Sequence, residues 1–77
     1  MKTLIILLQN RMLVEKIENQ IFENNSELVS TLRSLGMSEE EEENLGYYEL
    51  TDFMDLVNDQ VLDNLESTFI GYVTIKA

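Results

Sequence analysis

The chain of 77 residues contains no cysteine, no proline, no tryptophan and no histidine. Without cysteine, disulfides and thiolate metal sites are excluded, and so is catalysis by a thiol. Without histidine, the most frequent general base of enzymes is missing. A chain without cysteine fits a reducing compartment, so we expect the protein to be cytoplasmic. No linker rich in proline, glycine or serine divides the chain, which predicts a single domain over residues 1–77.

Motifs for catalysis, phosphate binding and metal binding are also absent. No serine lies in G-x-S-x-G or S-x-x-K, and the three glycines are too far apart for G-x-G-x-x-G or G-x-x-x-x-G-K-[ST]. The acidic residues form no D-x-[DN]-x-[DN]-G loop, and carboxylates along one straight helix do not surround an ion. We therefore expect a protein that is not an enzyme and that has no cofactor and no specific metal site.

Basic residues are few and unevenly placed. Five lysines and arginines stand against fifteen acidic residues, so the net charge is −10. The segment from Ser34 to Ile75 contains eleven acidic residues and no basic one. Direct binding to nucleic acid or to an anionic membrane requires a positive field, so neither is expected. The charge favours a basic protein surface as the partner.

Long apolar runs are absent too. The longest, Leu4–Leu8, falls far short of the roughly 20 residues of a membrane span. No small-residue cleavage site follows it, so we do not interpret it as a signal peptide. Because it is apolar on both faces, it predicts a buried strand over Thr3–Leu8.

The C-terminal stretch STFIGYVTIK is rich in β-branched and aromatic residues, which predicts a second strand with alternate residues on opposite faces. Gly71 within it indicates the close approach of another backbone, or a bulge. The stretch GYYEL, residues 46–50, predicts a brief extended segment between the helices.

Apolar residues at helical spacing predict two main helices between the terminal strands. Residues 11–35 keep their helical phase throughout, so we expect one long helix with Asn10 as its N-cap and Gly36 just beyond its end. Residues 52–66 form the second helix, with Thr51 as its N-cap.

Five consecutive glutamates occupy residues 39–43. Ser38 followed by Glu41 matches the capping box S-x-x-E, and acidic residues in a first turn suit the helix dipole. We therefore expect a short helix that ends near Gly46. Repulsion between neighbouring like charges opposes this helix, and a mobile loop is the alternative.

The predicted order is β-α-(short α)-α-β, a small α/β or α+β fold. We expect a single-layer sheet of two or three strands, with the N-terminal and C-terminal strands paired and two main helices packed on one face. Such a sheet has open edges, and pairing with a second copy in a homodimer would cover one of them.

The predicted helix over 52–66 carries the strongest functional signal. Five acidic residues recur on one side of it, forming a stripe about 20 Å long with neighbours about 5–6 Å apart. This spacing is of the order of the phosphate spacing along a nucleic-acid strand, about 3.4 Å. The first interpretation is the ordinary polar face of an amphipathic helix. A functional field is the alternative, and it gains support because like charges at this spacing destabilise a helix and no lysine offsets them. The stripe consists of Asp52, Asp55, Asp59, Asp63 and Glu66.

Other residues of the acidic segment are predicted as secondary contacts with a partner. Tyr48 is amphipathic and could stack on arginine, as aromatic residues at interfaces do. Leu56 falls within the stripe and could serve as an apolar anchor. The glutamate run adds Glu39, Glu40, Glu42 and Glu43.

These features predict a non-catalytic acidic module that binds a basic protein surface. In its specific form the module mimics nucleic acid and inhibits a nuclease or another nucleic-acid-binding protein, in the manner of anti-restriction and anti-CRISPR proteins of phages and mobile elements. The alternative is a structural or oligomerisation domain, or an accessory subunit, whose acidity only confers solubility.

Overall fold

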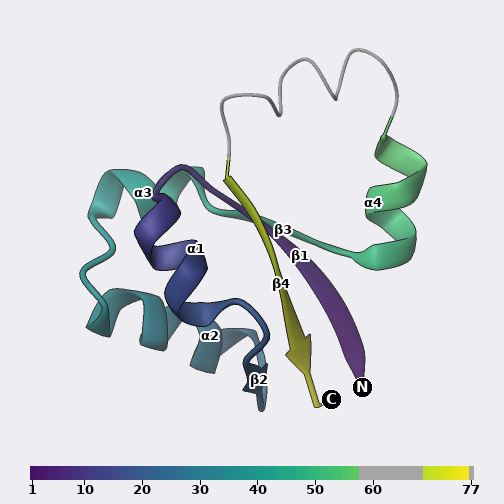
Figure 1. The fold of residues 1–77 in the computed structure, drawn as a ribbon, viewed down its shortest axis with the longest axis horizontal. Helices are drawn as coiled ribbons and strands as arrows, with labels where there is room; N and C mark the ends of the chain where they lie inside the picture. The colour runs from purple at the N-terminus through teal and green to yellow at the C-terminus, as the bar shows by residue number, and fades with distance from the viewer. Residues whose placement is uncertain (58–68, 77) are drawn as a thin grey trace.

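The computed structural model describes residues 1–57 and 69–76, which form four helices and four strands (Figure 1). This is a small α+β fold, as one of the two predicted classes states. In chain order the elements are β1 Lys2–Leu8, α1 Arg11–Ile17, β2 Ile21–Phe22, α2 Asn25–Ser34, α3 Glu39–Asn44, β3 Gly46–Glu49, α4 Leu50–Leu56 and β4 Phe69–Ile75.

β1 lies inside the sheet because its side chains are apolar on both faces. The strand order is β2-β4-β1-β3, with β1 antiparallel to β3 and β4 and with β2 parallel to β4. The predicted pairing of the terminal strands is confirmed, with Leu4 opposite Val73. The expected number of two or three strands was too low. The first four residues of GYYEL pair with β1 as β3. β2 has only two residues, too few to show the alternation of a strand.

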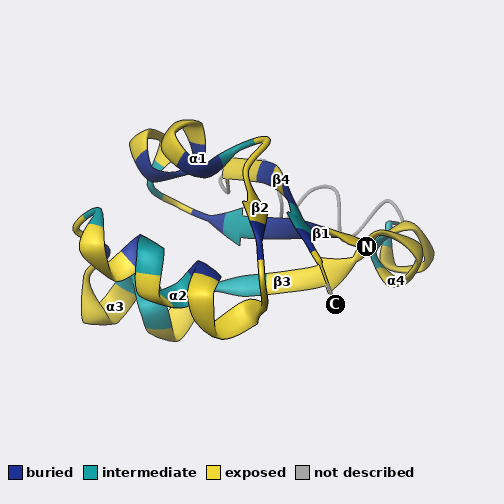
Figure 2. Cartoon of the chain, turned by 90° about the horizontal axis from the view of Figure 1, so that it is seen from below, coloured by how far each residue is buried: buried dark blue, intermediate teal, exposed yellow. Residues whose placement is uncertain are grey.

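α1 and α2 cover one face of the sheet and enclose the core. Buried residues lie on β1, on β4 and on the sides of the helices that face them (Figure 2). The side chains of alternate strand residues point to this face, as the pleat of a strand requires. The core consists of Leu4, Ile6, Leu8, Leu13, Val14, Ile17, Phe22, Leu28, Leu32, Met37, Val73 and Ile75.

Gly71 of β4 allows α1 to pack closely against the sheet. A Cβ atom at this position would lie 2.7 Å from Cγ1 of Val14, closer than carbon atoms pack in protein interiors. The close contact at Gly71 is therefore with a side chain, not with the backbone that the sequence predicted.

Replacing Gly71 with alanine is expected to lower the free energy of unfolding by about 1–3 kcal/mol, because the added methyl group overpacks the contact with α1. Urea unfolding followed by circular dichroism measures the change. Combining Gly71→Ala with Val14→Ala removes the colliding methyl group, so the glycine substitution should cost less in that background. An equal cost in both backgrounds would contradict the packing argument.

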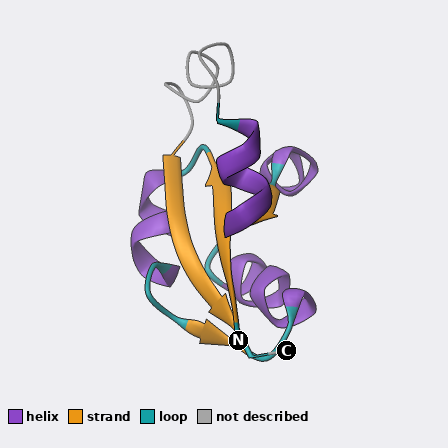
Figure 3. Cartoon of the chain, turned by 90° about the vertical axis from the view of Figure 1, so that its right-hand side faces the viewer, coloured by secondary structure: helices purple, strands orange, loops and turns teal. Residues whose placement is uncertain are grey.

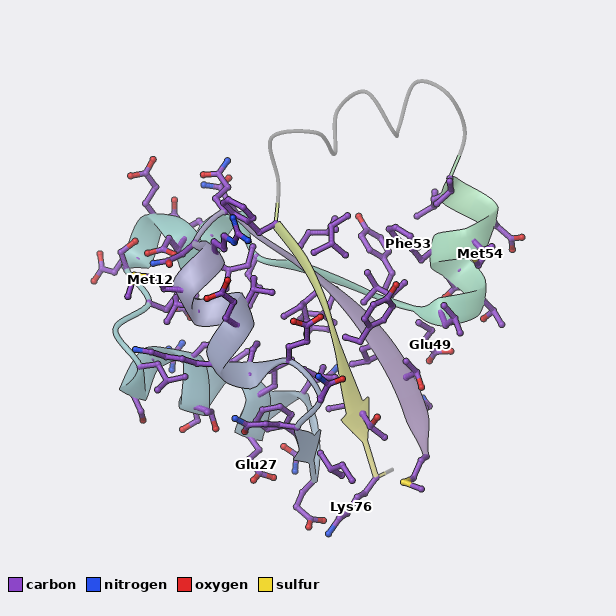
Figure 4. All side chains as sticks on the ribbon, viewed as in Figure 1. Met12, Glu27, Glu49, Phe53, Met54 and Lys76 are labelled. Atoms are coloured by element: carbon purple, nitrogen blue, oxygen red, sulfur yellow. The ribbon has the colours of Figure 1, made fainter. Side chains whose placement is uncertain are left out.

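α4 lies on the other side of the sheet from α1 and α2 (Figures 1 and 3) and contacts β1 and β3. Phe53 is half-buried and points from α4 toward the strands, whereas Met54 is 64% exposed and points away (Figure 4). Ile5 on this face is 2% exposed, but Ile70 and Tyr72 of β4 are 37% and 51% exposed. The expectation that the helices share one face was wrong. β1 is apolar on both faces, so Ile5 on the second face is also buried from water, and α4 packs on that face.

The single helix expected over residues 11–35 is interrupted. α1 ends at Ile17, and Asn19 adopts a left-handed backbone with φ 69°, which asparagine tolerates better than most residues. The N–H of Asn19 donates to the carbonyl oxygen of Tyr72, and β2 then pairs with β4. Asn24 accepts a hydrogen bond from the N–H of Glu27 and begins α2. Pairing with the free edge of β4 thus competes successfully with continuing the helix.

The second main helix is also shorter than expected. α4 begins at Leu50, one residue before the predicted N-cap Thr51, and the residue before it, Glu49, makes no capping hydrogen bond. α4 ends at Leu56, because Val57 has an extended backbone with ψ 97°. The remainder of the predicted helix, residues 58–66, lies outside the described residues.

The local signals at the other helix ends are confirmed. The side chain of Asn10 accepts hydrogen bonds from the N–H groups of Met12 and Leu13 at the start of α1. Gly36 follows α2 with φ 103°, the left-handed conformation that glycine adopts without strain. The glutamate run forms α3, so the helix was the correct prediction and the mobile loop was not.

Candidate docking surface

α3 carries a group of ordered carboxylates. The N–H of Glu41 donates to Oγ of Ser38 at 3.1 Å, and the N–H of Ser38 donates to Oε1 of Glu41 at 3.3 Å. This capping box satisfies backbone groups at the helix start and offsets part of the repulsion between the glutamates. Three carboxylates of α3 remain exposed and make no ion pair with another described residue. We call Glu39, Glu40 and Glu43 the α3 cluster.

Glu42, a predicted contact, is instead paired with Arg33 of α2. Nε of Arg33 donates to Oε2 at 3.1 Å, and Nη2 donates to Oε1. The hydrogen bond from Arg33 holds the pKa of Glu42 below its usual value, and the same bond raises the pKa of the Arg33 guanidinium. Glu42 therefore stays ionised but contributes little to the external field, because a cation lies against it.

α4 carries the two described residues of the predicted acidic stripe. Asp52 and Asp55 are exposed, lie one turn apart and make no ion pair with another described residue. We call them the α4 pair. Leu56, the predicted anchor, lies at the end of the same helix and is 43% exposed. The other three residues of the predicted stripe, Asp59, Asp63 and Glu66, lie outside the described residues.

The α3 cluster and the α4 pair lie at opposite ends of the molecule. α3 and α4 occupy the two ends of the longest axis, and β3 connects them (Figures 1 and 2). The molecule measures 34 Å along this axis. The predicted contacts of the acidic segment therefore form two groups, with the exposed rings of Tyr47 and Tyr48 on the strand between them.

The ion pairs among the described residues do not neutralise either acidic group. Within the part of the chain that the structure describes, four of the five cations are paired with a carboxylate, and Lys16 of α1 is the exception. Two of these pairs reach into the acidic segment and leave the α3 cluster and the α4 pair untouched. The pairs are Lys2–Glu49, Arg11–Glu15, Arg33–Glu42 and Lys76–Glu23.

A groove runs between β3 and α2. One hollow of about 510 Å³ is lined by residues of β1, β3, α4 and the start of α2. A second, of about 270 Å³, extends along α2 toward Val29 and Arg33. Both hollows are lined by Asn25, Ser26 and Tyr47, so they adjoin. Sequence reasoning missed the groove because it depends on α2 lying beside an edge strand, and only the tyrosine pair signalled an interface there.

Other kinds of site find no support in the described ranges. Residues 1–57 and 69–76 contain no group of three or more acidic side chains placed to hold a metal ion. None of the helices in the same ranges has the length and apolarity needed to cross a bilayer. Comparison of the chain with protein-family models, with curated proteins and with solved structures found no match.

Proposed function

We propose that the protein is a non-catalytic acidic module that binds a basic protein surface. The observation that carries the proposal is the α3 cluster, whose carboxylates are exposed on a capped helix and have no ion pair among the described residues. An ordered group of like charges keeps its field pointing in a constant direction. A field of this kind accelerates association with a cationic partner and selects against anionic ones.

The specific form of the proposal is mimicry of nucleic acid. Carboxylates on successive helical turns lie about 5–6 Å apart, the same order as phosphates along a strand. The α3 cluster and the α4 pair lie near the ends of an axis of 34 Å, and one turn of duplex DNA also rises about 34 Å. We therefore propose a nuclease or another nucleic-acid-binding protein as the partner, inhibited by occupation of its binding groove.

Binding to a panel of purified basic nucleases and DNA-binding proteins tests the proposal. We expect at least one member to bind the chain, with an association rate that falls about tenfold or more when the salt concentration rises from about 0.05 to 0.5 M, because salt screens steering. Duplex DNA should compete for the same site if the chain mimics nucleic acid. An acidic protein of similar size serves as the control.

Two results would contradict the proposal. Absence of binding to every member of the panel at low salt would rule out a basic protein as the partner. Binding that does not respond to salt would show that the field has no part in recognition. Binding that responds to salt without competition from DNA would support a basic protein as the partner but would rule out mimicry of nucleic acid.

One observation favours the alternative of an oligomerisation domain. Ile70 and Tyr72 leave an exposed apolar area on the sheet face that α4 covers only in part. If this area joins two copies, the mass in solution is that of a dimer and Tyr72→Lys returns it to that of a monomer. A monomeric mass at all accessible concentrations would remove this alternative.

A further inference from the structure

β3 is an edge strand with one unpaired side. It pairs with β1 only, and in antiparallel sheets alternate residues of an edge strand turn their N–H and C=O groups outward. Within the part of the chain that the structure describes, no hydrogen bond joins these outward groups to another segment. Proteins usually protect such an edge with proline, lysine or a bulge, and Gly46–Glu49 contains neither residue. The edge of β3 is therefore able to pair with a further strand.

The opposite edge of the sheet differs. β2 has two residues. The adjoining backbone groups of β4 are used, because the carbonyl oxygen of Tyr72 accepts from Asn19 and the N–H of Thr74 donates to Gln20. A short edge offers few groups for pairing. β3 is therefore the edge better suited to a partner.

The groove between β3 and α2 gives an added strand a place to lie. Tyr47 is opposite Ile6 and belongs to the α2 side of the sheet, whereas Tyr48 is opposite Ile5 and belongs to the α4 side. Both rings are 38% exposed. Side chains on either face of an added strand would thus meet an aromatic ring, and such cross-strand pairs stabilise sheets.

From these features we infer that β3 accepts an extended segment of a basic partner as a fifth strand of the sheet. The inference rests on the proposed function and specifies the chemistry of the partner. Strand addition of this kind takes its affinity from backbone hydrogen bonds and its selectivity from alternate side chains. The four residues of β3 pair with about 13 Å of extended chain.

Charge complementarity specifies the ends of the added segment. β3 runs from α3 to α4, so a strand paired with it has the α3 cluster beyond one end and the α4 pair beyond the other. Neither group makes an ion pair with another described residue. The segment that fits has β-branched or apolar residues in its centre and arginine or lysine at both ends.

A second copy of this chain fits the edge less well. Antiparallel pairing of β3 with β3 about a twofold axis places the α3 end of each copy beside the α4 end of the other. The α3 cluster of one copy would then approach the α4 pair of its partner, and each chain carries a net charge of −10. Like charges in direct apposition at an interface are unfavourable.

The test uses a synthetic peptide with alternating valine and threonine in its centre and two arginines at each end. Two further peptides carry N-methyl groups on the odd or on the even central residues, which blocks one edge of the peptide at a time. Isothermal titration at low salt measures their affinity for the full chain. We expect one methylated peptide to bind at least about tenfold more weakly than the other, because only one peptide edge faces β3.

Matched variants of α2 test the groove. Ser26 lines both hollows. Ser30 is also exposed and lies one turn further along α2, but it lines neither hollow. Ser26→Lys and Ser30→Lys change the net charge equally. We expect Ser26→Lys to weaken binding of the unmethylated peptide about tenfold or more and Ser30→Lys to change it less than about threefold.

Each contrary result has a distinct meaning. Equal binding of the two methylated peptides, or equal effects of the two lysine variants, overturns strand addition at β3 while leaving salt-dependent binding of basic proteins intact. Failure of the unmethylated peptide to bind also overturns it. A dimer whose mass is unaffected by the peptide shows that a second copy occupies the edge. Failure of the whole basic panel, in contrast, removes the proposed function itself.

Discussion

Ile6→Ala is expected to lower the free energy of unfolding by about 2–5 kcal/mol, whereas Ile70→Ala should lower it by roughly 1 kcal/mol or less. Ile6 is completely buried in the middle of the sheet, opposite Gly71 on one side and Tyr47 on the other. Ile70 lies on the opposite face and is 37% exposed. The same substitution therefore removes a core contact in one case and a surface contact in the other.

The loss at Ile6 is large relative to the stability of so small a domain. A chain of 77 residues has a free energy of unfolding of about 4–12 kcal/mol. Urea unfolding monitored by circular dichroism measures both variants, with the wild-type slope as a check that two-state behaviour is kept. Similar losses for Ile6→Ala and Ile70→Ala would show that the face carrying α4 is as tightly packed as the core.

Reversing the charges of the α3 cluster is expected to slow association with a basic partner about a hundredfold at low salt. The variant Glu39→Lys, Glu40→Lys and Glu43→Lys replaces an attractive local field by a repulsive one, and steered association rates respond steeply to such changes. The difference from wild type should shrink at high salt. Stopped-flow measurements with any partner from the panel give the rates directly.

Variants with equal changes in net charge separate the local field from the total charge. Asp52→Lys with Asp55→Lys reverses the α4 pair, and we expect it to slow association about tenfold. Glu15→Lys with Glu18→Lys makes the same change of net charge in α1 and at its C-cap, at residues that belong to neither acidic group, and should slow association less than about threefold. If the α1 variant slows association as much as the α4 variant, total charge rather than placement governs recognition.

Sequence reasoning was most successful where the determinant is local. Asn10, Gly36 and the Ser38–Glu41 capping box each act over a few residues, and each was located correctly. The terminal strands were also found, because their composition and alternation do not depend on neighbours in space.

The break between α1 and α2 could not be read from the same pattern. Apolar residues keep a helical phase across it. Phe22 is buried on β2, and the helical pattern also predicts a buried Phe22, so its apolar side chain does not distinguish the two structures. The interruption of the helix is accompanied by a backbone hydrogen bond from Asn19 to Tyr72, two residues that are distant in sequence. Tertiary contacts of this kind override helical propensity without leaving a periodic signal.

In the candidate surface, too, local features were predicted and features that depend on tertiary contacts were not. The sequence located the acidic segment, but not the separation of the α3 cluster from the α4 pair, since that depends on the path of β3. The pairing of Glu42 with Arg33 was equally hidden, because it joins α3 to α2. The groove beside Tyr47 was hidden for a similar reason, because it depends on α2 lying beside the edge strand β3.

The antiparallel pair at the centre of the sheet has a consequence for folding kinetics. Lys2 is opposite Ile75, so the central pairing closes a loop that spans nearly the whole chain. Contacts of such high order slow folding, because loop-closure entropy is lost before the contact is gained. Until β4 arrives, the apolar β1 has one unsatisfied edge and can pair with another chain. The strong negative charge disfavours that encounter between like chains, and so opposes aggregation while the chain folds.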